Sequence, residues 1–182
     1  MSQNDSSEQK KDRWMGYLAL STAIMAVLAA LTTLYMGKYS SRAILAQGQE
    51  SDQWAFYQAK SIKQHTFDLG KKALELQYRS QKGLSPMVAA EYEKTVAAYG
   101  NEVKRYDQEK KEIKDKAEVL GKDKLKAQAM GGNFAYALIF LQIAIMLSSL
   151  ASLTKRHYLW YIALLCNIGW LFFFLDGWLL FY

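Results

Sequence analysis

The chain has 182 residues, a formal net charge of +6, and a composition in which 51% of the residues are hydrophobic. Apolar residues gather at its two ends and charged residues between them, a separation that soluble globular domains seldom show. One cysteine, Cys166, and two histidines, His65 and His157, exclude a disulfide framework and leave little material for a metal site or for histidine-based catalysis. We therefore expect a non-enzymatic protein with no catalytic residue, no metal site and no cofactor.

Three segments have the length and polarity of membrane-spanning helices. After a polar tail over residues 1–13, the stretch 14–36 contains no charged residue, and about 20 apolar residues are enough to cross a bilayer. A second apolar stretch covers 134–153, and a third covers 158–182 and begins with the aromatic sequence YLWY. The four residues between the second and third stretches leave room only for an antiparallel pair of helices.

Basic residues on the short flanks predict the orientation, because cytoplasmic loops carry an excess of Lys and Arg. Three basic residues lie in the tail before the first span, and Lys155 and Arg156 join the second span to the third. Both groups lie on one side of a three-span protein. We expect this side, with the N-terminus, to be cytoplasmic, and residues 37–133 to be periplasmic or extracellular.

The insertion over 37–133 carries heptad spacing in both halves, which is typical of coiled coils. In its second half the repeated positions are apolar or aromatic apart from one lysine: Tyr92, Val96, Tyr99, Val103, Tyr106, Lys110, Ile113, Ala117 and Leu120. In its first half the same spacing selects smaller residues: Ala55, Ala59, Ile62, Thr66, Leu69, Ala73 and Leu76. The two sets predict two helices that pack through these seams.

A turn is expected between the halves, near residues 81–86. Gly83 can end one helix, and Ser85 followed by Pro86 can cap and start the next. The fold class is therefore an all-α membrane protein with three transmembrane helices and a long antiparallel helical hairpin, a coiled-coil stalk, inserted between the first and second. In this hairpin Leu69 would lie near Tyr99.

Glycines in the two arms fall into register around that turn. The matched pairs are Gly37 with Gly132, Gly48 with Gly121, and Gly70 with Gly100. A glycine in a helix interior costs about 1 kcal/mol relative to alanine. The pairs therefore indicate levels at which the arms approach closely or bend together, with coincidence as the alternative.

The stretch SDQWAFYQAKSIKQH, residues 51–65, contains more aromatic surface than one seam can bury. Trp54, Phe56 and Tyr57 cannot all face the partner arm, and exposed aromatic area on a slender stalk marks a contact. We interpret these three residues as an oligomer or partner contact rather than as part of a catalytic segment.

Polar groups within the apolar segments are candidates for contacts inside the membrane. Gln142 and Asn167 lie at similar depth in the second and third spans, where an amide hydrogen bond would contribute about 0.6 to 2 kcal/mol. Asp176 lies near the outer end of the third span, at a level suited to an interfacial ion pair with Lys38 or Arg42.

The sequences GYLALSTAIMAVLAAL and GKYSSRAILAQGQESDQWAFYQAKSIKQ resemble a bacterial membrane-protein family catalogued as domain of unknown function 4337. The resemblance covers nearly the whole chain, and its most specific part is SDQWAFYQAKSIK. It implies a multi-pass protein of the bacterial inner (cytoplasmic) membrane. It assigns no catalytic or binding residue.

These patterns favour a protein that self-assembles into a homo-oligomer and acts as an envelope scaffold or organiser through its stalk. One alternative is a channel or transporter subunit lined by Gln142, Asn167 and Asp176. Another is a module that binds polyanions or lipid headgroups, since residues 37–133 contain eighteen Lys and Arg against thirteen Asp and Glu. The expected partners are the lipid bilayer, further copies of the chain and another envelope protein, and not nucleic acid.

Overall fold

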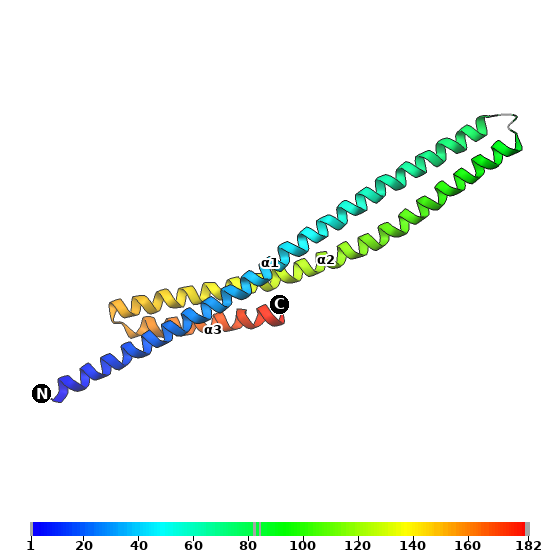
Figure 1. The fold of residues 1–182 in the computed structure, drawn as a ribbon. Helices are drawn as coiled ribbons and strands as arrows, with labels where there is room; N and C mark the ends of the chain where they lie inside the picture. Colours follow the sequence, from blue (N-terminus) through cyan, green and yellow to red (C-terminus); the bar gives the residue numbers. More distant parts are fainter. Residues whose placement is uncertain (1, 82, 84, 181–182) are drawn as a thin grey trace. The chain divides into compact units, whose positions relative to one another are not determined.

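The computed structural model describes residues 2–81, 83 and 85–180. Across these residues it contains helices and no strand: α1 (Ser2–Ser80), α2 (Pro86–Thr154) and α3 (His157–Leu179) (Figure 1). The expected all-helical class is confirmed. Each helix contains a stretch long and apolar enough to cross a membrane by length and composition.

The ends of α1 and α2 follow from local residue chemistry. Gly83, just beyond α1, has a φ of 82°, a left-handed conformation that glycine adopts without steric cost. Pro86 is the first residue of α2, where its missing N–H removes no helical hydrogen bond. The Ser85 hydroxyl accepts a hydrogen bond from the Val88 N–H at 3.4 Å, as a helix-capping residue does.

The residues divide into two compact units, which are described separately. Unit 1 consists of the described residues up to 44 and from 124 onward, and unit 2 of residues 45–123. In unit 1 the core is built from small and aliphatic residues of all three helices. Met25, Leu141, Ala144 and Ala163 are buried there, and the indole of Trp170 packs against them. Small residues in such a core let helix backbones approach closely.

Aromatic rings form a second cluster in unit 1. The Phe134 ring stacks on Tyr35 and Tyr39, with centroids 5.5 and 5.6 Å apart, and meets the Phe174 ring edge-on at 5.3 Å. The Phe134 side chain is fully buried. Aromatic rings at these separations attract each other more strongly than the burial of their surface area alone would account for. The cluster ties α1, α2 and α3 together.

In unit 2, contacts join α1 to α2 at successive levels (Figure 1, cyan to green). The Lys60 ammonium lies 2.6 Å from the Glu109 carboxylate, and the Gln64 amide donates to the Val103 carbonyl at 3.3 Å. Further contacts pair the rings of Phe67 with Tyr99 at 5.3 Å and of Tyr78 with Tyr92 at 5.7 Å. As the position along α1 rises, the position of its partner along α2 falls.

The seam expected on α2 does face inward, since all nine of its residues, from Tyr92 to Leu120, are buried or half-buried. The seam expected on α1 is wrong, because every one of its seven residues, from Ala55 to Leu76, is exposed. The residues that α1 turns inward are half-buried and lie two positions away: Gln53, Tyr57, Lys60, Gln64, Phe67, Lys71, Leu74 and Tyr78. Two residues correspond to about 200° around a helix.

The physical reason for this difference is the tyrosine content of α2. Tyr106 is buried, and the Phe67 ring stacks on its ring with centroids 5.8 Å apart. The Lys60 ammonium lies over the same ring, 5.3 Å from its centroid. Ring pairs and cation–π contacts of this kind need long or aromatic partners. Alanine, threonine and leucine on the other face of α1 cannot supply them.

The matched glycines mark close approach at two levels, in each case at one glycine of the pair. A Cβ added at Gly70 would lie 2.8 Å from the Tyr99 ring, whereas one added at Gly100 would meet nothing nearer than 3.9 Å. At Gly37, Gly48 and Gly132 it would meet nothing within 4 Å. At Gly121 it would lie 3.1 Å from a carboxylate oxygen of Glu50. In both close cases the neighbour is a side chain, so the register brings no two glycine backbones together.

This geometry predicts opposite effects of two Gly→Ala changes in unit 2. Gly100→Ala should raise the free energy of unfolding by up to about 1 kcal/mol, because alanine has the higher helix propensity. Gly70→Ala should lower it, because overpacking typically costs about 1 to 3 kcal/mol and Phe67 holds the Tyr99 ring in place. Chemical unfolding followed by circular dichroism in mild detergent measures both. Equal stabilisation by the two changes would contradict the close contact at Gly70.

Candidate functional site

The outer stripe of α1 is the main unexplained surface of unit 2. We define it by seven residues: Ala55, Ala59, Ile62, Thr66, Leu69, Ala73 and Leu76. All are exposed, and the fractions for Ile62, Leu69 and Leu76 are 68%, 67% and 67%. Their spacing alternates between four and three residues, which places them on one face of the helix. The stripe is therefore a continuous apolar face directed away from α2.

The outer stripe is more apolar than the face that contacts α2. Of the eight inward positions, Lys60 and Lys71 are charged and Gln53 and Gln64 carry amides, whereas Thr66 is the one polar residue of the stripe. Because the tyrosines of α2 select the other face, the more apolar face of α1 is exposed to water in a single copy. An exposed apolar face of this kind is a candidate interaction site.

The three aromatic residues expected to form a contact divide between the two faces. Tyr57 is half-buried toward α2, where the Lys110 ammonium lies 5.3 Å from its ring centroid. Trp54 packs edge-on against Tyr57 at 5.7 Å and is 36% exposed. Phe56 is 58% exposed and borders the outer stripe. The contact itself remains a prediction, with Phe56 as its most accessible ring.

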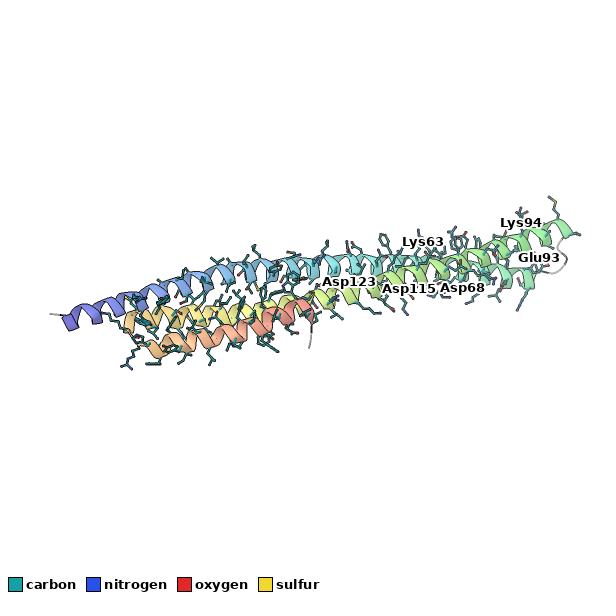
Figure 2. The ribbon with its side chains drawn as sticks, turned by 90° about the horizontal axis from the view of Figure 1, so that it is seen from below. Lys63, Asp68, Glu93, Lys94, Asp115 and Asp123 are labelled. Carbon is teal, nitrogen blue, oxygen red and sulfur yellow. The ribbon has the colours of Figure 1, made fainter. Side chains whose placement is uncertain are left out.

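Charged side chains line both helices of unit 2 (Figure 2). The labelled examples lie on α1 and α2: Lys63, Asp68, Glu93, Lys94, Asp115 and Asp123. The hydrogen bond from Lys60 is the main cause that lowers the pKa of Glu109, and the hydrogen bond from Lys72 lowers the pKa of Asp68 in the same way. The Asp68 carboxylate in turn raises the pKa of Lys72. The charges therefore pair along the helices and do not gather into one site.

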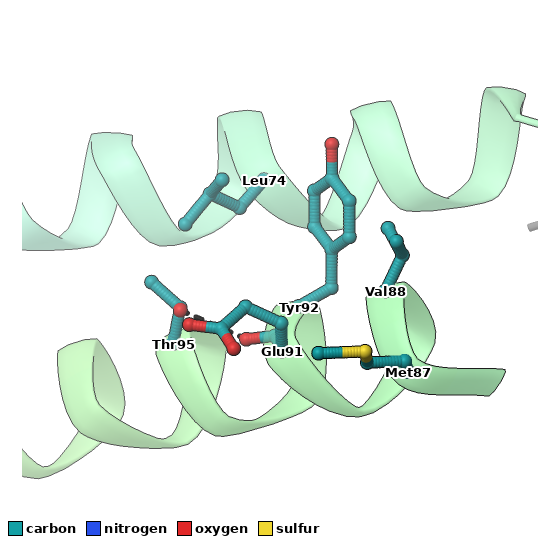
Figure 3. A pocket seen from close by; sticks show the side chains of 6 residues that line it. All are labelled: Leu74, Met87, Val88, Glu91, Tyr92 and Thr95. Atoms are coloured by element: carbon teal, nitrogen blue, oxygen red, sulfur yellow. Dashed lines mark hydrogen bonds between the residues drawn. The ribbon is translucent and has the colours of Figure 1, made fainter. Parts of the chain in front are cut away.

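An open groove of about 360 Å³ lies beside the start of α2. Its lining combines one residue of α1 with five of α2: Leu74, Met87, Val88, Glu91, Tyr92 and Thr95 (Figure 3). The Tyr92 ring extends from α2 toward α1, and the Thr95 hydroxyl donates to the Glu91 backbone carbonyl at 2.8 Å. Glu91 is the one carboxylate among these six residues, so the groove holds no acid–base pair of carboxylates.

The polar groups of unit 1 are arranged differently from the expectation. Asp176 is 3% exposed and accepts a hydrogen bond at 2.7 Å from the Asn133 amide, a partner that the sequence pattern did not single out. The ion pair of Asp176 with Lys38 or Arg42, both exposed, remains a prediction. Asn133 directly precedes the apolar stretch, and this position is the one signal that could have suggested it.

The two amides expected to pair inside the apolar segments have different surroundings. The Asn167 side chain donates to the Ala163 carbonyl of its own helix at 2.9 Å, and Gln142 is exposed. A hydrogen bond between the two therefore stays a prediction.

Two indole N–H groups, also missed in the sequence, link α3 to α1. Trp170 donates to Thr32 at 3.1 Å and Trp160 donates to Ser21 at 3.0 Å. Thr32 is fully buried, and its own hydroxyl donates to the Leu28 carbonyl at 2.7 Å. These hydrogen bonds provide partners for indole N–H and hydroxyl groups, which would be costly to bury without a partner.

Within the part of the chain that the structure describes, no group of three or more His, Cys, Asp or Glu side chains could hold a metal ion.

The Lys60–Glu109 pair predicts a measurable response to acid. Because the folded-state pKa of Glu109 is lowered, the pair stabilises the fold above the ordinary carboxyl pKa, and this effect is lost as the pH falls through the lowered value. Glu109→Gln removes the titration, so its melting temperature should fall less than the wild type's between about pH 7 and pH 3. Glu112→Gln changes an exposed glutamate of α2 and should keep the wild-type acid sensitivity. Equal falls in Glu109→Gln and the wild type would contradict this role of the pair.

One protein family matches the chain by sequence. The model of the family described as Domain of unknown function (DUF4337) matches residues 14–180, so the match includes the outer stripe and the apolar stretches of all three helices. No curated protein and no solved structure matches the chain. The resemblance seen in the sequence is confirmed, and the chain belongs to the family described as Domain of unknown function (DUF4337).

Proposed function

We propose that the chain is a non-enzymatic membrane protein that assembles with copies of itself and serves as a scaffold or organiser in the bacterial envelope. Each of its three helices has an apolar stretch that would cross the inner membrane. The Lys and Arg residues of the short flanks support a cytoplasmic N-terminus, with residues 37–133 in the periplasm or outside the cell.

The part outside the membrane would be a hairpin of α1 and α2. The order of contacts in unit 2 supports this arrangement, because Lys60 pairs with Glu109 and Tyr78 with Tyr92. Two helices alone bury few residues. Of the nine seam residues of α2, Tyr106 and Ala117 are buried, and the other seven are only half-buried.

The observation that carries the proposal is the outer stripe. In a single copy, Ile62, Leu69 and Leu76 each leave about two thirds of their surface in water. Burial of apolar surface contributes roughly 25 cal/mol per Å². An apolar face with heptad spacing is best buried against another helix with the same spacing, and in a homo-oligomer every copy provides such a helix.

The mass of the full chain in mild detergent tests this proposal. By light scattering with the detergent contribution subtracted, we expect a defined multiple of 20.8 kDa. The double change Ile62→Asp with Leu69→Asp should reduce that multiple, because it places carboxylates in a contact that excludes water. The control Val119→Asp alters an exposed apolar residue of α2 and should leave the mass unchanged.

A wild-type mass of 20.8 kDa at all concentrations would overturn the proposal. Circular dichroism of the double variant checks that its helices remain, as expected for changes at exposed positions.

A further inference from the structure

We infer that the outer stripe packs against the same stripe of a second copy, in parallel and in register, so that each stripe residue meets its equivalent. This inference rests on the proposed self-assembly and adds the surface, the direction and the register of the contact. A two-fold axis along the pair of helices would relate the copies, and both would present one self-complementary face.

The residue types on the stripe fit a helix as the occupant. In heptad terms Ala59, Thr66 and Ala73 occupy position a, and position d has Ala55, Ile62, Leu69 and Leu76. Leucine at d favours two-stranded parallel pairs, and small residues at a let two helix axes approach closely. The side chain at d is small at Ala55 and larger at Ile62, Leu69 and Leu76, so the contact should be strongest from Ile62 to Leu76.

The hydrocarbon core of a bilayer does not fit the stripe, because charged residues border it on both sides. Lys63 follows Ile62, and Lys72 lies between Leu69 and Ala73. Both lysines are exposed. A face flanked in this way is not suited to the hydrocarbon core, since lysines are expensive to place there. Its three alanines also offer little apolar area to a bilayer surface.

The flanking residues favour this register. In a parallel in-register pair, each residue at position g faces the position e residue five places later on the second copy. Gln58 then faces Lys63, and Lys72 faces Gln77. Each lysine meets a neutral amide that can accept a hydrogen bond, so no like charges oppose each other at these two levels. The exposed ring of Phe56 also lies at a position e and would be covered at the rim of the contact.

The direction follows from the proposed membrane anchorage. Every copy has the same apolar stretches and the same basic flanks, so every copy inserts with the same orientation. The outer stripes of copies in one membrane therefore run in the same direction. An antiparallel pair would need copies inserted with opposite orientations.

Single-cysteine cross-linking in native membranes tests the inference. In a Cys166→Ala background, which removes the one native cysteine, we would introduce Ile62→Cys, Leu69→Cys or Leu76→Cys and add a short thiol-reactive cross-linker. Each variant should give a covalent dimer of twice 20.8 kDa. Ala98→Cys, an exposed position on α2, is the matched control and should stay uncross-linked.

Co-expression of differently tagged Ile62→Cys and Leu76→Cys chains tests the register. In a parallel in-register pair these positions are fourteen residues apart, about 21 Å along the helix, so no product carrying both tags is expected. A mixed product would overturn the register and the direction.

The result also separates this inference from the proposed function. If light scattering shows an oligomer but the three stripe positions cross-link no better than Ala98→Cys, the inference fails and self-assembly stands. If the protein is a monomer of 20.8 kDa, both fail.

Discussion

The organisation of unit 2 depends on which face of α1 meets the tyrosines of α2. The half-buried face supplies Phe67 for ring contacts with Tyr99 and Tyr106, and Lys60 for an ion pair and a cation–π contact. Once these long side chains turn inward, helix geometry turns the residues two positions away outward. The exposed apolar stripe is therefore a consequence of the aromatic seam, and the two faces form one arrangement.

The inward face repeats every seven residues along α1, in both units. Its buried and half-buried positions include Leu18, Met25, Thr32 and Tyr39 in unit 1 and Gln53, Lys60, Phe67 and Leu74 in unit 2. The spacing is the same in both units, but the chemistry differs: the four positions in unit 1 are uncharged, whereas those in unit 2 include the amide of Gln53 and the ammonium of Lys60. A seven-residue repeat is what helices need to stay in contact over many turns.

Helix existence and the turn could be predicted from the sequence because both depend on local signals. Heptad spacing, Gly83 and the Ser85–Pro86 pair act within a few residues of themselves. The seam of α2 was also predictable, since it includes every aromatic residue between residues 86 and 133. On α1 two sets of residues have heptad spacing, and a choice by hydrophobicity gives the wrong one. The inward set is selected by aromatic and cation–π contacts, which depend on both helices and cannot be read from α1 alone. The Asn133–Asp176 bond was missed for the same reason, since it joins residues 43 positions apart.

Because the two faces of α1 differ in chemistry, dissolved salt affects the contacts of each face differently. The seam toward α2 contains the Lys60–Glu109 pair and lysines placed over the rings of Tyr57 and Tyr106, interactions that dissolved ions screen. The outer stripe is apolar, and contacts between such faces are strengthened by salts that are excluded from protein surfaces. Raising the concentration of a salt such as sulfate should therefore weaken the charged contacts of the seam while it favours association through the stripe. Ionic strength around unit 2 therefore acts in opposite directions on the charged contacts within one copy and on apolar contact between copies.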